Sequence, residues 1–118
     1  MAVDKSLISG STSMLILRLL EEKDMYGYEM IEGLRRKSRN VFELKAGTLY
    51  PLLHGMETKG LLRSYTLTDK ASQSEKAGKT RKYYSITKEG RRALSEKKEE
   101  WIAYTQAVAD VLSVGGAL

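Results

Sequence analysis

A helix predicted between residues 45 and 60 carries the side chains best suited to contact a partner, and the chemistry they favour is non-covalent contact. One face of this helix is an apolar stripe at i, i+3, i+4 and i+7, made of Leu49, Leu52, Leu53 and Met56. The opposite face is small and polar, and consists of Gly47, Pro51, His54 and Thr58, flanked by Thr48 and Tyr50. A helix that only faces water usually carries many Lys and Glu residues there. This small, polar face, which we call the bare face, therefore predicts a helix that enters the major groove of DNA.

The charge distribution favours a partner that carries phosphates. Residues 1–34 hold three Lys and Arg against six Asp and Glu, a net charge of −3. Residues 35–82 hold twelve against four, a net of +8, and residues 83–118 hold five against five, a net of zero. The positive charge thus gathers around the bare helix, as expected for contact with a DNA backbone. A basic surface that is merely solvated is the alternative interpretation of this composition.

Composition argues against several other classes of protein. The 118 residues suit one small domain with an appendage. The chain has no cysteine and one histidine, His54, so disulfides and thiolate metal sites are excluded and a zinc cluster is not expected. No glycine-rich phosphate loop and no recognisable pair of nucleophile and base occurs, so neither an enzyme nor a cofactor is expected. With no apolar run of ~20 residues and no secretory signal, the sequence predicts a cytoplasmic protein without a membrane partner.

Two helices are predicted to support the bare helix. Residues 6–23 are apolar around most of a helical circumference, so they must be buried on more than one side, and one side could meet a second chain. Residues 25–39 form the next helix, whose basic end at 35–39 could complement the helix dipole or touch a phosphate. Asn40 breaks that helix, and residues 41–44 read as a short extended piece. The arrangement is typical of a helix-turn-helix.

The ends of the bare helix follow from its capping residues. It is predicted to begin near Gly47 or Thr48, where the Thr48 hydroxyl could cap it. Pro51 would then lie in the first turn, where its missing N–H does little harm. Gly60 is expected to stop the helix in a left-handed conformation, with Lys59 in the last turn.

A basic β-hairpin is predicted directly after this helix. Residues 61–68 and 80–87 are rich in β-forming residues, and the polar segment 69–79 between them would form a long tip. Positive charge loads the tip and the returning strand at Lys76, Lys79, Arg81 and Lys82. A basic hairpin in this place predicts a wing that lies along the DNA backbone. Tyr83 and Tyr84 must point to opposite faces of the hairpin, and the register decides which of them enters the core.

One long helix, from residue 88 to about 114 with Thr87 as its cap, is predicted to end the chain. Leu94, Trp101 and Val108 repeat every seven residues and Tyr104 joins their stripe, which indicates a helix that packs against another helix. The predicted fold class is α+β: a winged helix-turn-helix of three helices plus a β-hairpin wing, with one long C-terminal dimerisation helix. Residues 1–87 would form the DNA-binding domain and residues 88–118 the dimerisation helix.

Four motifs in this order resemble the PadR family of bacterial transcriptional regulators. They are residues 26–30 (Tyr-Gly-Tyr-Glu-Met), 47–53 (Gly-Thr-Leu-Tyr-Pro-Leu-Leu), 57–61 (Glu-Thr-Lys-Gly-Leu) and 81–90 (Arg-Lys-Tyr-Tyr-Ser-Ile-Thr-Lys-Glu-Gly). The resemblance covers about residues 8–108. The short length and the single C-terminal helix resemble the compact subfamily that includes multidrug-sensing repressors.

The resemblance implies a two-fold dimer that binds a double-stranded operator with inverted half-sites, usually as a repressor. The recognition-helix contacts that it implies are made by Lys45, Thr48, Tyr50, Pro51, His54 and Thr58. In that scheme Thr48 and Tyr50 contact the backbone or groove, whereas Pro51 and His54 face base edges. The ligand or dimer interface would comprise Leu7, Met14, Leu94, Trp101, Tyr104 and Val108. Because the groove face has no Arg or Asn for bidentate readout, phosphates and DNA shape should supply much of the affinity.

Two questions stay open at this point. In compact multidrug-sensing members, flat aromatic drugs stack on a tryptophan of the last helix at the dimer centre. Trp101 matches that place, and the preceding Glu99 and Glu100 would suit a small aromatic or cationic effector, but Trp101 could also serve only as a dimer anchor. The other alternative is a winged helix that binds proteins rather than specific DNA, against which the +8 segment argues.

Overall fold

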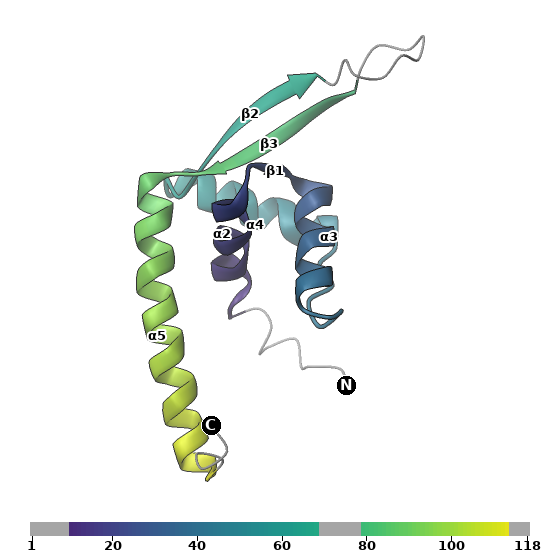
Figure 1. Ribbon diagram of the computed structural model, residues 1–118. Coiled ribbons are helices and arrows are strands. Elements are labelled where there is room, and N and C mark those ends of the chain that lie inside the picture. The colour runs from purple at the N-terminus through teal and green to yellow at the C-terminus, as the bar shows by residue number, and fades with distance from the viewer. Residues whose placement is uncertain (1–9, 69–78, 114–118) are drawn as a thin grey trace.

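The computed structural model describes residues 10–68 and 79–113 of the chain (Figure 1). Its elements in chain order are α2 (Thr12–Glu22), β1 (Met25–Tyr26), α3 (Gly27–Lys37), α4 (Ala46–Thr58), β2 (Leu62–Thr68), β3 (Thr80–Ile86) and α5 (Lys88–Leu112). The predicted contacts Leu7 and Lys76 lie outside the described residues. The α+β winged helix-turn-helix with one long C-terminal helix is the observed fold.

The core lies where α2, α3 and α4 meet beneath the sheet. Ile16, Leu17 and Leu20 of α2 are almost completely buried, as are Leu49 and Leu53 of α4. The buried residues of α2 cover a wide arc of the helix, as its all-round apolarity predicted. Leu52, expected in the same stripe of α4, is partly buried against this core.

The sheet is antiparallel with strand order β1-β3-β2. The predicted hairpin of residues 61–68 and 80–87 is confirmed, within one residue at each strand. Strand β1 was missed, because Met25 and Tyr26 were assigned to the following helix. Two residues are too few to show a period of two, and their strand conformation depends on pairing with Tyr84 and Tyr83, far along the chain.

The register resolves the question of the adjacent tyrosines. Tyr84 pairs with Met25 and Ser64, is 4% exposed and belongs to the core. Tyr83 points to the outer face of the sheet, where it lies between Tyr26 and Tyr65. The core face of the sheet thus covers the helices, and the outer face is free to carry other contacts.

The first turn of α4 differs from the prediction. The helix begins at Ala46, with Lys45 at the N-cap and no side-chain cap, so Thr48 is not the capping residue. The Lys45 carbonyl already accepts bonds from the Thr48 and Leu49 N–H groups, both at 2.9 Å. The earlier start moves Pro51 into the second turn, where the helical bond to the Gly47 carbonyl cannot form. At the other end Gly60 has φ +80, which confirms the predicted left-handed stop.

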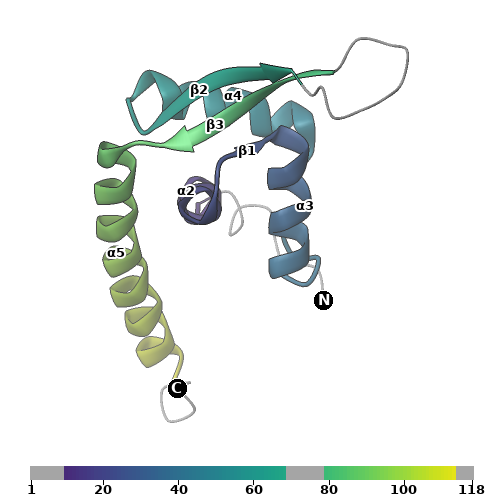
Figure 2. The same ribbon diagram turned by 45° about the horizontal axis from the view of Figure 1, so that its top comes forward.

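Helix α5 projects away from the rest of the domain in both views (Figures 1 and 2). Thr87 caps it as predicted, because its side chain accepts a bond from the Gly90 N–H at 3.0 Å. The first half of α5 packs beside α2, and Leu94 is 1% exposed in the core. The second half carries exposed apolar side chains. Within residues 10–68 and 79–113, α5 thus packs on its own domain mainly through its first half, although Ala109 near its far end is also buried.

Candidate nucleic-acid interface

The exposed face of α4 carries all six residues predicted for it. Lys45, Thr48, Tyr50, Pro51, His54 and Thr58 are exposed, opposite the buried Leu49, Leu53 and Met56. The acid of this helix, Glu57, is half-buried and accepts a hydrogen bond from the Ser64 hydroxyl at 2.6 Å. That bond turns the carboxylate toward β2 and away from the bare face. The face therefore offers little repulsion to an approaching phosphate.

The polar side chains on this face differ in how many hydrogen bonds they can still make with a partner. The Thr58 hydroxyl donates to the His54 carbonyl at 2.9 Å, so its proton is already used within the helix. Its oxygen lone pairs remain as acceptors. The His54 ring is exposed and has one donor and one acceptor nitrogen when neutral. His54 is thus the most versatile polar group for reading a base edge.

Tyr50 is held against the first residue of α3. A Cβ atom added at Gly27 would collide with the Tyr50 hydroxyl, so this close approach requires a glycine at position 27. The phenol nevertheless remains 46% exposed. The hydroxyl consequently lies at the N-terminal end of α3, where the partial positive charge of the helix also favours an anion. The arrangement suits the phosphate contact expected of this tyrosine.

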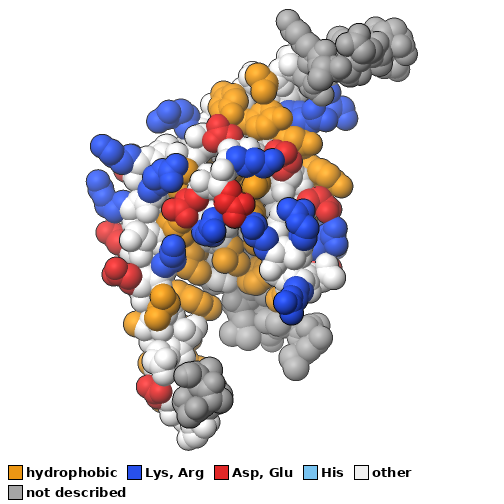
Figure 3. Space-filling view, viewed as in Figure 1, with side chains coloured by type: hydrophobic (Ala, Val, Ile, Leu, Met, Phe, Trp, Pro, Cys, Tyr) orange, Lys and Arg blue, Asp and Glu red, His pale blue; other side chains and the backbone are white. Residues whose placement is uncertain are grey.

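The wing carries its cations on both of its faces. Lys79 and Lys82 are exposed, and Arg81 is half-buried. The Arg81 guanidinium lies 4.8 Å above the Tyr26 ring on the outer face, whereas the Lys82 ammonium lies 5.6 Å from the Tyr84 ring on the core face. The two neighbours therefore cannot contact one phosphate side by side. In Figure 3, Lys and Arg side chains flank the base of the hairpin.

A row of three tyrosines crosses the outer face of the sheet, and sequence reasoning missed it. Tyr83 stacks on Tyr65 with ring centroids 5.7 Å apart and meets Tyr26 edge-on at 5.3 Å. Such aromatic pairs contribute about 0.5–1.5 kcal/mol each. The Tyr65 hydroxyl donates to Asp24 at 2.7 Å, and this bond raises the pKa of Tyr65. The row ties the base of the wing to the segment before α3.

The basic end of α3 is partly engaged in ion pairs. Arg35 binds Glu32 at 2.6 Å, and this hydrogen bond raises the pKa of the guanidinium. Lys37 binds Glu22 of α2 at 3.0 Å, which lowers the pKa of that carboxyl. Helix α3 ends at Lys37 with Ser38 as its C-cap, two residues before the predicted end, and Asn40, predicted to break the helix, lies in the turn that follows with φ +70. Arg35 is thus paired within α3 and Lys37 joins α3 to α2, which differs from both roles considered for this run, complementing the helix dipole and touching a phosphate.

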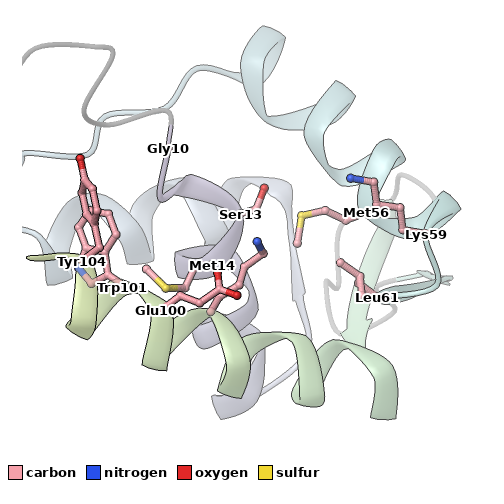
Figure 4. Close-up of a pocket in the computed structure, with 10 residues that line it drawn as sticks. Gly10, Ser13, Met14, Met56, Lys59, Leu61, Glu100, Trp101 and Tyr104 are labelled. Atoms are coloured by element: carbon pink, nitrogen blue, oxygen red, sulfur yellow. The ribbon is translucent and has the colours of Figure 1, made fainter.

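A groove of about 480 Å³ lies between α2, α5 and the C-terminal end of α4 (Figure 4). Trp101, Tyr104 and Met14 line one end, and Met56 and Lys59 line the other. The rings of Trp101 and Tyr104 lie 6.0 Å apart. Glu100 also lines the groove. The structure thus brings together three of the residues predicted for a ligand or dimer interface.

The remaining members of that predicted set occupy different surroundings. Leu94 is buried in the core of its own domain, so its predicted place in the interface is wrong. It shares the heptad spacing of Trp101 and Val108 because one stripe of α5 packs on the domain's core at Leu94 and is exposed farther along the helix. Val108 is 38% exposed on the projecting half of α5, beyond the groove.

Two kinds of site have no counterpart in the part of the chain that the structure describes. Within residues 10–68 and 79–113, no group of three His, Asp or Glu side chains could hold a metal ion. No helix in those ranges is long and apolar enough to cross a membrane. The exposed face of α4, the basic wing and the groove therefore are the features that call for a functional account.

Comparison with known proteins decides the class. Residues 16–96 match the Transcriptional regulator PadR-like family. The chain belongs to this family. An uncharacterized protein of Lysinibacillus sphaericus is 35% identical over 115 residues, which is 96% of this chain and 97% of that protein.

Solved structures of transcriptional regulators share this fold over about nine tenths of the chain. A transcriptional regulator from Clostridium thermocellum has a TM-score of 0.80 and 30% identity, covering 92% of this chain and 97% of its own. A PadR family regulator from Eggerthella lenta has a TM-score of 0.77 and 34% identity, covering 91% and 86%. The protein is thus a PadR-like DNA-binding transcriptional regulator rather than an enzyme.

Proposed function

We propose that this PadR-like protein is a homodimeric, sequence-specific repressor that acts in the cytoplasm on an operator with inverted half-sites. In this proposal residues 1–87 bind DNA and residues 88–118 join two copies. A small aromatic or cationic effector at the dimer interface relieves repression. The operator would be contacted by one α4 helix and one wing from each copy, so the symmetry of the DNA would match that of the protein.

The observation that carries the dimer is the apolar surface on the projecting half of α5. Its exposed members are Trp101 (40%), Ile102 (66%), Tyr104 (62%), Val108 (38%), Val111 (85%) and Leu112 (66%). Figure 3 shows hydrophobic side chains along this part of the helix. A cluster of this kind on one helix marks a protein contact. A second copy of the same helix would bury it, and the heptad spacing of Trp101 and Val108 suits such a helix pair.

The proposed DNA contacts come from the exposed face of α4 and from the wing. Lys45, Thr48 and Tyr50 would fix the N-terminal half of α4 on phosphates. Pro51, His54 and Thr58 would face base edges in the major groove. Lys79, Arg81 and Lys82 would bind the backbone from the two faces of the wing. Since few of these groups read bases, backbone contacts should dominate the affinity.

The effector would bind against the rings of Trp101 and Tyr104, which provide an aromatic surface beside Glu100 in the groove. To change operator occupancy, it must bind the DNA-compatible and DNA-incompatible dimers with different affinity. A change in the angle between the two α5 helices would alter the spacing of the α4 helices. Half-sites one or two helical turns apart would then no longer fit.

Two experiments test the dimer and the DNA contact. Sedimentation velocity should give twice the 13.3 kDa mass of the chain, about 26.6 kDa. Fluorescence anisotropy with DNA from upstream of the protein's own gene should show affinity that falls by about 10³-fold or more between 50 and 200 mM salt. A monomer at micromolar concentration would contradict the dimer. A flat salt response, or no binding at low salt, would contradict operator binding dominated by phosphates.

A further inference from the structure

The end of the recognition helix and the start of α5 are fastened together at a junction of four residues, Gly60, Leu61, Thr87 and Gly90, which we call the elbow. The Thr87 hydroxyl donates to the Gly60 carbonyl at 2.6 Å and accepts from the Gly90 N–H at 3.0 Å. The Thr87 N–H donates to the Leu61 carbonyl at 3.1 Å. One threonine therefore bonds to the end of α4, to the segment after it and to the first turn of α5.

The two glycines of the elbow are required for different reasons, Gly60 for its backbone conformation and Gly90 for a close approach. Gly60 has φ +80, a conformation that side chains other than glycine rarely adopt. A Cβ atom at Gly90 would collide with the Leu61 carbonyl oxygen and crowd the Ile86 side chain. Gly90 lies in the first turn of α5, where glycine weakens a helix. Glycine at position 90 thus weakens the first turn of α5 but allows it to contact the backbone of Leu61 directly.

A small rotation at the elbow would produce a large displacement at the far end of α5. At about 1.5 Å per residue, the 25 residues of α5 span about 37 Å. A rotation of about 10° at the elbow would therefore move the far end of α5 by about 6 Å, nearly two base-pair steps of about 3.4 Å. In a dimer joined through the far half of α5, the same rotation would displace each recognition helix relative to its half-site.

We infer that Thr87 is a positioning residue for operator recognition. The bonds of its hydroxyl to Gly60 and Gly90 fix the angle between α4 and α5. That angle sets the distance between the two recognition helices of a dimer. This inference rests on the proposed dimer. It assigns to Thr87 a role beyond capping α5, because the bond to Gly60 is not needed for a cap. The two bonds can be separated by substitution.

Three forms of the protein separate the cap from the fastening bond. Thr87→Ser keeps a hydroxyl that can donate to the Gly60 carbonyl and accept from the Gly90 N–H. Thr87→Asp keeps a good N-cap acceptor but cannot donate to that carbonyl. The unchanged protein is the third form. Circular dichroism melting curves should show all three folded, since the aspartate retains the cap.

The first readout is the distance between the two recognition helices. The chain has no cysteine, so Gly47→Cys introduces a single site for a spin label on each copy. Gly47 is exposed, and a Cβ atom there meets nothing within 4 Å. Double electron–electron resonance without DNA should give one narrow distance distribution for the unchanged and serine forms. The aspartate form should give a distinctly broader one.

The second readout is discrimination between operators, measured with unlabelled protein. Thr87→Asp should bind the natural operator about fivefold more weakly, the factor expected for one lost hydrogen bond. It should lose most of the preference for natural half-site spacing over spacings changed by one base pair. A purely structural role would weaken binding to all spacings by the same factor.

Equal distance distributions and equal spacing preferences in a folded Thr87→Asp protein would overturn the inference. A Thr87→Ser protein that behaves like the aspartate form would also overturn it, because the hydroxyl would then not be the cause. Failure of the proposed function looks different. If the protein is not a dimer, the labelled protein with Thr87 intact would show no dipolar signal. If it does not bind the operator, the unlabelled protein would show no change in anisotropy.

Discussion

The recognition helix α4 and the C-terminal helix α5 each expose one long face, and the two faces consist of opposite kinds of residue. On α4 the exposed residues are small or polar, such as Thr48 and His54. On the far half of α5 they are large and apolar, such as Trp101 and Val111. The two faces also differ in their support, because α4 buries an apolar stripe opposite its exposed face, whereas Ala109 is the buried residue in the described far half of α5.

The contrast indicates which partner each helix can accept. Apolar surface gains about 25 cal/mol per Å² when it leaves water, so the face of α5 favours another apolar protein surface. The face of α4 gains little by that route, but its small side chains allow a helix backbone to approach a groove closely. One helix is thus suited to protein association and the other to DNA. Three substitutions test this division, starting from the largest expected effect.

The largest effect is expected from a charge placed on the apolar face of α5. Trp101→Asp should make the protein a monomer at micromolar concentration, because burying an unpaired carboxylate is unfavourable. Operator affinity should then fall by ~100-fold or more, since two half-sites are no longer bound by one linked dimer. Sedimentation velocity and fluorescence anisotropy measure the two consequences.

Ala103→Asp is the matched control for that charge. Ala103 is exposed on the same helix, about 200° around from Trp101. The variant should remain dimeric and bind the operator as the unchanged protein does. A dimer that survives Trp101→Asp, or dissociates equally with Ala103→Asp, would remove the distinction between the two sides of α5.

An intermediate effect is expected where α4 meets α3. Gly27→Ala should displace the Tyr50 side chain, which is half-exposed and can move, so the protein should stay folded. Operator affinity should fall by roughly tenfold, the value of one hydrogen bond to a charged group. The measurement is anisotropy in a double-mutant cycle with Tyr50→Ala. If Gly27→Ala weakens binding just as much in the Tyr50→Ala background, the tyrosine is not the group through which Gly27 acts.

The smallest effect on total affinity is expected at the bare face itself. His54→Ala should change affinity by about twofold but shift the preference among base pairs at one operator position by about fivefold, since a side chain that faces a base edge specifies sequence. Competition binding against an operator library measures both quantities. Arg81→Ala is the comparison, because a backbone contact should weaken all sequences about equally. Identical sequence preferences in the two variants would show that α4 does not read bases through His54.

The elements that were predicted correctly are those whose signals are local. The hairpin strands, the stop at Gly60 and the Thr87 cap each depend on residues that are neighbours in the chain. The buried stripe of α4 was also correct, because helical periodicity identifies it without reference to a partner. The predicted contribution of Leu94 to an interface was wrong, since heptad spacing identifies a packed stripe and not what it packs against.

Other features of the site depend on residues that are distant in the chain. The row of Tyr26, Tyr83 and Tyr65 exists only through the register of β1, β3 and β2, and Asp24 joins it 41 residues away from Tyr65. The contact of Tyr50 with Gly27 and the bonds of Thr87 to Gly60 arise in the same way. No spacing rule along the chain could have found these pairs.

The amino-acid sequence by itself determined the type and order of most elements, the charge of the central segment and the bare face of the recognition helix. Those properties follow from side-chain periodicity, turn chemistry and composition, which act over a few residues at a time. Only the tertiary structure decided that Tyr50 lies at the start of α3, that Leu94 belongs to the core and that Thr87 fastens α4 to α5. These depend on the packing of distant segments, because hydrogen bonds and van der Waals contacts act only over a few ångströms and form only once folding has brought the segments together.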